Sequence, residues 1–513
     1  MNVEELVSAL TLEEKAGLCS GADFWHTKAV ERLGIPAIKV SDGPHGLRTQ
    51  KEGSTDPNDA IEAVCFPAGC AAAASFDPAL TRRMGAALGR EARASGVQVL
   101  LGPAVNIKRS PLCGRNFEYY SEDPYLAGEL AAGFIQGVQS EGVGTSIKHF
   151  AANSQETRRL SADSRVDERT LHEIYLPAFE TAVKKARPWT VMCSYNRVNG
   201  DYASENKPLL TDILRDDWGF GGFVMSDWGA VNDRVKGVAA GLELEMPGSG
   251  GVYDRKIIEA VQNGTLDIGV LDKAVARILN IVLRAADLAK LPAVFDHAAD
   301  HKLAVELAKQ SAVLLRNLGA LPLHKGQKVA YIGAFADHPR YQGGGSSHVN
   351  TTAISAMDAA IMNDRRVSYI EGFPADRDQR DEAEFLRAVT AAEAAGCIRI
   401  YAGLAETVVG RTLLLIGEHG ICLTHLFELR LSGFIAGVAV RVVLHGKATI
   451  RFLDLVLRCP ALDAEHLIVV LFSHGLLLVF RMNETLIRFL YVEKEPLDRI
   501  PPLLRQASSF ESA

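Results

Sequence analysis

A carboxylate and an indole stand side by side where a short apolar run ends, at Asp227 and Trp228. The preceding residues, Gly-Phe-Val-Met-Ser, have the composition of a buried strand. A carboxylate in this position can attack or stabilise an anomeric carbon, and the indole offers a pyranose an apolar surface. The same pattern also fits a strand followed by an aspartate that caps a helix. The rest of the chain has to decide between a sugar-cleaving site and a cap.

A second carboxylate, Asp42, follows the apolar run 35–41 in the segment Ser-Asp-Gly-Pro-His-Gly-Leu-Arg. An aspartate accepts two hydroxyl hydrogen bonds, which suits adjacent equatorial hydroxyls of a sugar. An Asx turn before Gly-Pro is the structural alternative.

Charged and aromatic residues are dense in segment 109–124, which contains Arg115. A guanidinium that pairs with a nearby carboxylate is held rigidly and still points donors at a ligand. A surface cluster of ion pairs is the alternative, but the flanking prolines and aromatics favour a buried, ordered loop.

Two further strand ends carry polar groups. Lys148 and His149 are adjacent, and neighbours on a strand face opposite ways, so both reach one ligand only if the regular strand has ended there. Segment 153–156 follows and adds amides and Glu156, to which we assign no role.

Tyr195 stands at the end of the next predicted strand and supplies a phenol that could hydrogen-bond a nucleophile and the region of the sugar ring. The alternatives are a core histidine and a half-buried tyrosine at a strand end.

The elements that carry these groups alternate between β-rich runs and amphipathic helical segments as far as residue 290, which predicts a parallel sheet. In each run the apolar part comes first and the polar residues come at the C-terminal end. A (β/α)₈ barrel uses all its strand ends in this way, whereas a doubly wound sheet uses one switch point. The sequence therefore predicts an α/β, TIM-like barrel, with strands in 35–42, 97–107, 145–150, 190–196, 222–228 and 241–248.

Composition changes along the chain predict four regions. Residues 1–287 form the (β/α)₈ barrel, 288–300 a linker, and 301–410 an incomplete α/β sandwich domain that contains a polar glycine-rich loop at 339–348. Residues 411–513 form an atypical tail in which helical and strand patterns conflict. This tail is either an unusual buried subdomain or a sequence that does not complete the second domain.

Seven motifs in order resemble glycoside hydrolase family 3, the β-glucosidase type, over about residues 1–405. They are SDGPHGLR, GRNFEYYSEDP, KHF, DERTLHEIYLPAFE, SYN, VMSDWGA and PRYQGGGSSH. The resemblance implies a barrel followed by an α/β sandwich and a retaining mechanism without a cofactor. No motif in the sequence demands a metal. The segment after KHF is unlike that of the family's N-acetylhexosaminidases, which implies gluco- or xylo-configured substrates.

The resemblance also implies roles for individual residues. Asp227 stands at the position of the family's nucleophile, and Trp228 lines the site beside it. The residues at the positions that hold the non-reducing-end glucosyl unit are Asp42, Arg115, Lys148, His149 and Tyr195. The acid/base glutamate of the family follows a strand that corresponds to 401–404. The expected Glu-Gly-x-Asp-Arg pattern is missing there, so Glu406 is the candidate acid/base and Glu418 a weaker one.

Composition bounds the remaining properties. The chain has 513 residues, is 48% hydrophobic and 23% charged, and carries a formal charge of −7 without a lysine or arginine cluster. We therefore expect neither nucleic acid nor a membrane as a partner. The family resemblance implies small β-glucosides or oligosaccharides as substrates. Scattered cysteines and an acidic N-terminus predict a cytoplasmic protein. The oligomeric state is left open.

The sequence leaves three functional hypotheses. The first is a retaining hydrolase that releases terminal non-reducing β-D-glucosyl residues by double displacement, impaired because its acid/base loop is not recognisable. The second is a non-catalytic sugar-binding protein or truncated pseudoenzyme that keeps the glucosyl subsite. The third, a phosphate- or nucleotide-binding protein that uses the glycine-rich loop, is weakened because no lysine follows that loop.

Overall fold

The computed structural model forms two compact units, and each is described by itself. Of the described residues, the first unit contains Met1–Ser311 and Gln342–Thr352, and the second contains Ala312–Tyr341 and the residues from Ala353 onward. The structure describes residues 1–403 except 57, 315–316, 318–320, 325, 340, 364, 366, 373–380 and 396, and the backbone of 410–413, 442–443, 468–473 and 476–481.

The first unit is built on a parallel sheet in the order β1-β2-β3-β5-β8. These strands are β1 (Val40–Asp42), β2 (Val99–Leu101), β3 (Gly144–Phe150), β5 (Thr190–Cys193) and β8 (Phe223–Ser226). Parallel bridges extend the sheet from Met225 to Leu244 and from Glu245 to Ser20, and an antiparallel bridge from His26 to Lys39 leads back to β1. The sheet thus closes on itself as the predicted TIM-like barrel, although segment 241–248 contributes bridges and not a regular strand.

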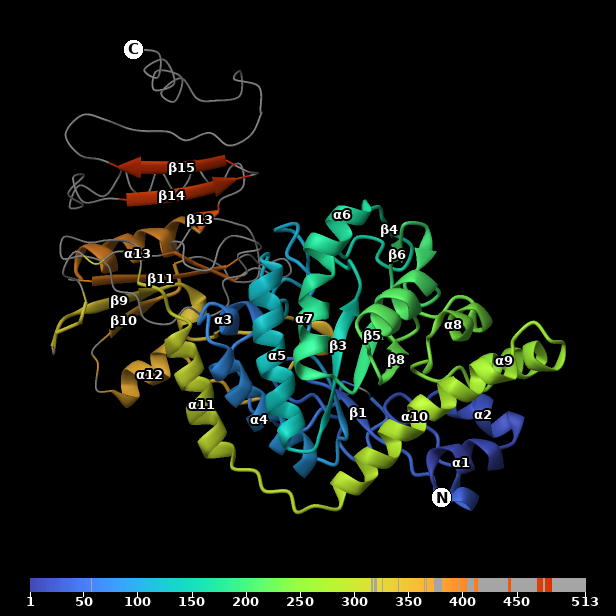
Figure 1. The fold of residues 1–513 in the computed structure, drawn as a ribbon. Helices are drawn as coiled ribbons and strands as arrows, with labels where there is room; N and C mark the ends of the chain where they lie inside the picture. The colour runs from blue at the N-terminus through green and yellow to red at the C-terminus, as the bar shows by residue number, and fades with distance from the viewer. Residues whose placement is uncertain are drawn as a thin grey trace, which may run out of the picture. The chain divides into compact units, whose positions relative to one another are not determined.

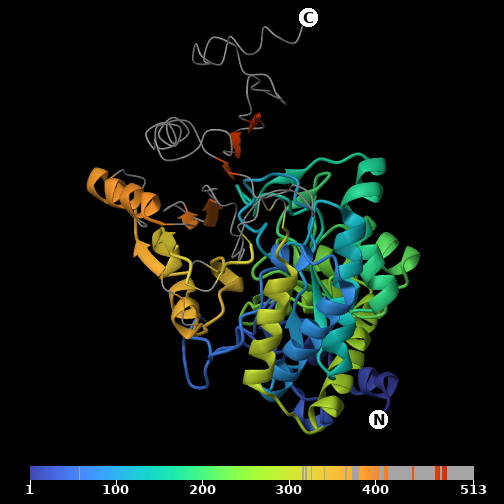
Figure 2. The same ribbon diagram turned by 90° about the vertical axis from the view of Figure 1, so that its left-hand side faces the viewer.

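Helices cover the outside of this sheet (Figure 1). The long ones are α4 (Pro78–Ala94), α5 (Pro124–Ser140), α7 (Pro177–Ala186) and α10 (Ile268–Ala289). α4 and α5 each start with an aspartate cap followed by proline, the combination that satisfies free N–H groups and fixes the first turn. They pack side by side (Figures 1 and 2). This close approach requires glycine at 137, where a Cβ would collide with the carbonyl oxygen of Arg82.

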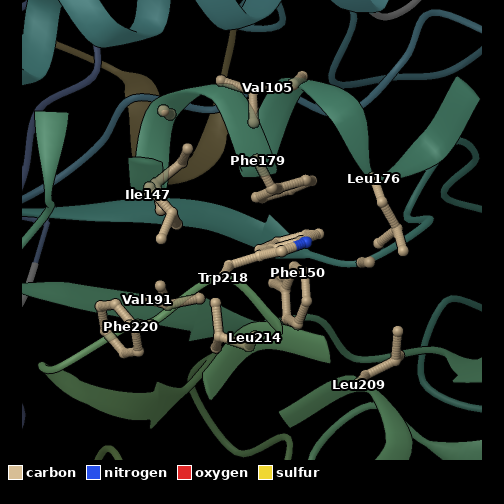
Figure 3. Packing of buried hydrophobic residues seen from close by; sticks show 14 of the residues in the cluster. Val105, Ile147, Phe150, Leu176, Phe179, Val191, Leu209, Leu214, Trp218 and Phe220 are labelled. Carbon is tan, nitrogen blue, oxygen red and sulfur yellow. The ribbon is translucent and has the colours of Figure 1, made fainter. Parts of the chain in front are cut away.

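An aromatic core between sheet and helices fixes the orientation of β3. Phe150 packs edge to face against Phe179 of α7 and Trp218, with ring centroids 5.2 and 5.8 Å apart (Figure 3). Ile147 belongs to the same cluster (Figure 3). Ile147 and Phe150 both point outward to the helices, because the regular alternation of β3 is interrupted between them. The intervening Lys148 and His149 can therefore both face the barrel interior.

The first unit also contains shorter elements. They are α1 (Val3–Ala9), α2 (Leu12–Leu18), η1 (Glu31–Leu33), α3 (Gly69–Ala73), β4 (Asp163–Ser164), α6 (Glu168–Thr170), η2 (Leu171–Tyr175), β6 (Arg197–Val198), β7 (Asp201–Tyr202), η3 (Pro208–Asp217), α8 (Arg234–Ala240), α9 (Val252–Gln262), α11 (His297–Gln310) and η5 (Gly345–Ser347). Helix α11 lies in this unit because Ala304 and Leu307 are buried in its core. The sequence pattern predicts a second domain from residue 301, so it places most of this helix there, whereas the structure places the helix in the first unit.

The second unit contains a mixed sheet in the order β10-β9-β11-β12, in which β12 is antiparallel to β11. Its elements are β9 (Val329–Ile332), η4 (Ala334–Ala336), α12 (Ala356–Met362), β10 (Val367–Ile370), α13 (Glu382–Glu393), β11 (Cys397–Gly403) and β12 (Gly410–Leu413). A further sheet joins β13 (Val442–Val443), β14 (Ile468–Ser473) and β15 (Leu476–Arg481). Apart from these strands, the predicted tail 411–513 lies outside the described residues. Among the helices described here, none is long and apolar enough to cross a bilayer.

Candidate active site

Polar side chains gather at the C-terminal ends of the barrel strands. Asp42 ends β1, Lys148 and His149 lie near the end of β3, Tyr195 follows β5, and Asp227 follows β8. Because these strands are parallel, their C-terminal ends lie at the same end of the barrel. The register between β3 and β5 shifts between Ile147 and Phe150, so the regular alternation of β3 is interrupted where its two polar residues stand.

Asp227 is buried, and its two carboxylate oxygens differ in their surroundings. Oδ1 accepts a hydrogen bond of 2.8 Å from the backbone N–H of Trp228. Oδ2 has no hydrogen-bond partner among the described residues, although it is shielded from solvent. The carboxylate is therefore oriented through one oxygen and leaves the other free to react.

His149 lies beside that free oxygen, with Nε2 3.7 Å from Asp227 Oδ2. Asn106 holds the histidine backbone on both sides, since its amide donates to the His149 carbonyl and accepts from the His149 N–H. Burial, aided by the charges of Arg115 and Lys148, lowers the pKa of His149 well below 6.5. The imidazole is therefore neutral at neutral pH, and its contact with Asp227 is not an ion pair.

Asp42 is buried to a similar degree but is paired on both oxygens. Arg48 Nη1 donates to Oδ2 at 2.8 Å, and Lys148 Nζ lies 3.5 Å from Oδ1. Arg48 is held in turn by Asn58, whose side-chain oxygen accepts from Nη2 at 2.6 Å. Two buried cations thus orient this carboxylate and leave it with lone pairs for further donors.

Arg115 is held by Glu118, whose carboxylate accepts a hydrogen bond from Nε. Burial lowers the pKa of Arg115, but the charges of Glu118 and Asp227 outweigh burial and keep that pKa well above its usual value. Two serines of the glycine-rich segment Gln342–Thr352, which belongs to the first unit, join this pair. Ser347 donates to Glu118 at 2.9 Å, and Ser346 accepts from Arg115 at 3.4 Å.

Tyr195 is fixed through its hydroxyl and its ring. The hydroxyl donates to the carbonyl of Trp228 at 2.9 Å. Tyr195 is therefore bound to the residue that directly follows Asp227 in the sequence. The Arg159 guanidinium lies over the ring, 4.5 Å from the centroid, and Glu156 accepts a hydrogen bond from Arg159 at 2.7 Å. Burial, aided by the charge of Asp227, raises the pKa of the Tyr195 phenol, which therefore remains a neutral donor.

The other carboxylates of the cluster are each engaged by a cation. Asp42 is paired with Arg48 and Lys148, Glu118 with Arg115, and Glu156 with Arg159. Although burial raises it, the pKa of Glu118 is held below 4.5 by Arg115 and Lys148. The predicted acid/base Glu406 and its alternative Glu418 lie outside the described residues.

Every other predicted site residue lies in this cluster, including Trp228, whose half-buried indole donates to the Phe24 carbonyl at 3.0 Å. Sequence reasoning missed the roles of Arg48 and Arg159. Arg48 closes the motif that contains Asp42, and an antiparallel bridge between the two residues folds the motif back on itself. Arg159 follows the unassigned Glu156 by three residues, a spacing typical of a local ion pair.

Family models match most of the chain. One described as the glycosyl hydrolase family 3 N terminal domain matches residues 12–281, and one described as the glycosyl hydrolase family 3 C-terminal domain matches residues 312–417.

Individual relatives match over the same part. A thermostable beta-glucosidase B from Acetivibrio thermocellus is 53% identical over 413 residues, which are 79% of this chain and 55% of the relative. An exo-alpha-(1->6)-L-arabinopyranosidase from Bifidobacterium longum is 47% identical over 78% of this chain and 55% of the relative. The chain thus spans about half the length of the curated relatives it matches.

Solved structures agree with these matches. A GH3 beta-glucosidase from Bifidobacterium adolescentis superposes with a TM-score of 0.73 at 46% identity, over 78% of this chain and 58% of that one. Beta-glucosidase 3B from Thermotoga neapolitana, solved with alpha-D-glucose, gives 0.68 at 39% identity, over 76% of this chain and 56% of that one.

Proposed function

This chain belongs to glycoside hydrolase family 3, and we propose that it is a retaining β-glucosidase-type hydrolase with Asp227 as its nucleophile. The substrates are small β-glucosides or oligosaccharides, cleaved at the terminal non-reducing glucosyl unit. The proposal rests above all on one observation, the buried Asp227 carboxylate with one oxygen held and the other free.

The chemistry follows from that arrangement. Asp227 Oδ2 attacks the anomeric carbon while the bond to the leaving oxygen breaks and that oxygen takes a proton from the acid/base, which later accepts the proton of the attacking water. A glycosyl ester on Asp227 results. Water then attacks the same carbon, loses a proton, and releases glucose and the free carboxylate, so that the anomeric configuration is retained. A neutral His149 beside Oδ2 brings no positive charge to the nucleophilic oxygen.

The remaining residues bind the glucosyl unit. Asp42 accepts sugar hydroxyls while Arg48 and Lys148 hold it in place. Arg115, fixed by Glu118, keeps donors that a sugar oxygen can use. Tyr195 orients the backbone that follows the nucleophile, and Trp228 faces the sugar with its ring.

Glu118 is not a candidate for the acid/base, because a general acid must hold a proton near neutral pH and, although burial raises it, the pKa of Glu118 is held below its usual value by Arg115 and Lys148. Burial raises the pKa of Asp42, but Arg48 and Lys148 already face its two oxygens and hold it as a sugar-binding group. We assign no acid/base role to Glu156, which is paired with Arg159. Glu406 stays a prediction. A substrate whose aglycone leaves without protonation depends little on this residue, whereas loss of a general acid costs about 10²–10⁴-fold for an ordinary glycoside.

The decisive experiment compares 4-nitrophenyl β-glucoside with cellobiose and follows the first-formed anomer of glucose by NMR. We expect β-glucose. A 2-deoxy-2-fluoro β-glucoside with a good leaving group should label the peptide that contains Asp227, detected by mass spectrometry. Asp227→Ala with azide should yield the α-glucosyl azide, since azide replaces the lost nucleophile. Labelling of another carboxylate would show that the nucleophile is misassigned.

The alternative, a non-catalytic sugar-binding protein that keeps the glucosyl subsite, is an outcome of the same experiment. It predicts that glucose binds while neither glucoside is hydrolysed. Turnover of the activated substrate alone would place the defect in the acid/base.

A cytoplasmic location is part of the proposal. Cys19, Cys113 and Cys193 are buried free thiols, as expected in a reducing compartment. Fractionation of the native host, with the hydrolase activity followed against a cytoplasmic marker, tests this location.

A further inference from the structure

We propose that Tyr119 is a positioning residue for the reaction: its buried hydroxyl donates a hydrogen bond to Nδ1 of His149 and holds the imidazole with its Nε2–H turned to Asp227. Asn153 and Glu156 orient that hydroxyl from the other side. This inference rests on the proposed function, because it concerns the surroundings of the proposed nucleophile. It also gives a role to Glu156, for which the sequence indicates none.

The contacts of His149 place a different partner at each ring nitrogen. Nε2 faces Asp227 Oδ2 at 3.7 Å, and Nδ1 lies 3.4 Å from the hydroxyl oxygen of Tyr119. The rings of Tyr119 and His149 meet edge to face, with centroids 6.1 Å apart, and both side chains are fully buried. Because a neutral imidazole carries one N–H, the hydrogen bond at Nδ1 decides what Nε2 presents to the nucleophile.

Asn153 and Glu156 fix what the Tyr119 hydroxyl is able to do. Nδ2 of Asn153 donates to the hydroxyl oxygen at 3.1 Å and to Glu156 Oε1 at 3.0 Å. Glu156 is paired with Arg159 at 2.7 Å, and a carboxylate in an ion pair only accepts hydrogen bonds. The opposite orientation of the amide would press its oxygen against this carboxylate. The phenol oxygen therefore accepts from Asn153 and keeps its own proton to donate.

Two acceptors compete for the phenolic proton of Tyr119, and the charge of Asp227 decides between them. Nδ1 of His149 lies at 3.4 Å and the Asn153 carbonyl at 3.3 Å. If the hydroxyl donates to the carbonyl, the ring proton is on Nδ1 and Nε2 turns a lone pair to the carboxylate. If it donates to Nδ1, the ring proton is on Nε2 and an N–H points at the carboxylate. Charges are weakly screened in the interior, so the second arrangement is the more stable one.

Burial keeps both groups in the protonation states that this arrangement needs. Burial, aided by the charges of Arg115 and Lys148, lowers the pKa of His149 well below 6.5, so its ring is neutral. Burial also raises the pKa of the Tyr119 phenol well above its usual value, so the phenol keeps its proton. An N–H beside Oδ2 attracts the attacking oxygen, whereas a lone pair would repel it. Tyr119 thus acts on the reaction through His149.

The test compares two neighbouring tyrosines in the full chain. Tyr119→Phe removes the hydroxyl that contacts His149. Tyr120→Phe is the matched control, because Tyr120 is equally buried but its hydroxyl has no hydrogen-bond partner within the described part of the chain. Each variant loses one buried hydroxyl and keeps its ring, so general effects of the substitution on packing are common to both.

A spectroscopic measurement reports the hydrogen bond directly. Protein labelled with ¹⁵N-histidine is studied by long-range ¹H–¹⁵N NMR, and the signals of His149 are assigned by their absence in His149→Gln. We expect the wild type to carry the ring proton on Nε2. Tyr119→Phe should shift the signal of the unprotonated Nδ1, because this nitrogen loses its donor, and Tyr120→Phe should leave it in place. A proton on Nδ1 in the wild type, or an unchanged Nδ1 signal in Tyr119→Phe, would overturn the inference.

Kinetics show whether the hydrogen bond matters for the reaction. We expect Tyr119→Phe to lower kcat/KM for 4-nitrophenyl β-glucoside by roughly 3- to 10-fold, the size of one hydrogen bond, and Tyr120→Phe to change it less than about twofold. In a His149→Gln background Tyr119→Phe should have no further effect, since Tyr119 acts through the imidazole. A loss of the same size in that background, or in Tyr120→Phe, would show a general structural role instead.

The NMR measurement also separates this inference from the proposed function, because it needs no turnover. If the wild type hydrolyses no glucoside, the hydrolase is rejected, while a proton on Nε2 and a shifted Nδ1 signal in Tyr119→Phe still establish the contact that positions His149. If Asp227 is labelled as the nucleophile but the proton is on Nδ1, the positioning role of Tyr119 alone is rejected.

Discussion

Asp42 and Asp227 end two strands of the same barrel and are similarly buried, at 6% and 8% exposed, yet their surroundings are opposite. Both oxygens of Asp42 face cations, Arg48 and Lys148. Asp227 has one backbone N–H on one oxygen and no partner within the described residues for the other. Burial of a strand-end carboxylate therefore does not define its role; the partners do.

The two arrangements have different consequences. A carboxylate between two buried cations is held in one orientation, which suits the binding of sugar hydroxyls. A buried carboxylate oxygen without a partner costs stability and persists where chemistry needs it. The comparison predicts that a change of Asp227 lowers activity strongly and affects stability little. A change of Asp42 should lower stability more and the rate of the chemical step less.

The largest effect is expected for Asp227→Asn, an isosteric change that removes the nucleophile. Loss of a covalent catalytic group lowers kcat on the order of 10⁴–10⁶-fold. Thermal unfolding should remain unchanged or shift upward, because an unpaired buried charge is removed. Steady-state kinetics and calorimetry check both parts. A clearly destabilised variant would mean that Asp227 has a structural role like that of Asp42.

Asp42→Asn should be less severe for the chemical step but more severe for the fold. The change leaves Arg48 and Lys148 without their counter-charge, and breaking a buried pair in this way costs about 3–5 kcal/mol of unfolding free energy. Denaturant unfolding measures this cost, and the inhibition constant of glucose reports the loss of hydroxyl binding. An Asp42→Asn variant as stable as the wild type would remove the distinction between the two aspartates.

The pH dependence of stability tests whether the imidazole of His149, which lies beside Asp227, is buried in its neutral form. Its pKa is lowered well below 6.5 in the folded protein, so the unfolded chain binds the proton more readily and acidification below pH 6.5 favours unfolding. The contribution is at most about 1.4 kcal/mol per pH unit. We expect His149→Gln to lose less stability than the wild type between pH 6.5 and about pH 5. Equal slopes would argue against a buried neutral imidazole.

The smallest effect on stability and substrate binding is expected for a change of Asn58, which contacts Asp42 only through Arg48. Asn58→Ala removes the hydrogen bond that holds Arg48 but leaves the pair of Arg48 and Asp42 in place. One such part-buried bond is worth about 0.5–1.5 kcal/mol. A rise in KM with an unchanged kcat is expected, since the binding carboxylate is held less firmly. A fall in kcat alone would place Asn58 outside the binding side.

Much of the barrel was predictable, because strand ends with polar residues recur at 42, 148–149, 195 and 227 with apolar runs before them. The bounds of individual strands and of the domains were less predictable. The predicted strand 241–248 contributes only bridges, since Leu244 and Glu245 pair singly with Met225 and Ser20. The local sequence pattern predicts that helix α11 starts a new domain, but Leu307 of this helix packs into the core of the first unit.

Within the site, long-range pairing was not predictable. That Ser347 would donate to Glu118, 229 positions earlier, depends on where Gln342–Thr352 packs and not on any local pattern. The orientation of Arg159 over Tyr195 is of the same kind. The acid/base stays a prediction at Glu406, outside the described residues.

The sequence by itself determined which side chains stand at the strand ends, because a strand of period two followed by a polar turn is a local property of the chain. It determined in this way that Asp42 and Asp227 would face the same end of a barrel. Only the tertiary structure decided that cations surround the first while the second keeps a free oxygen. The partners come from Arg48, Lys148, Trp228 and His149 on different segments, and their distances are set by closure of the barrel and by packing of the helices around it.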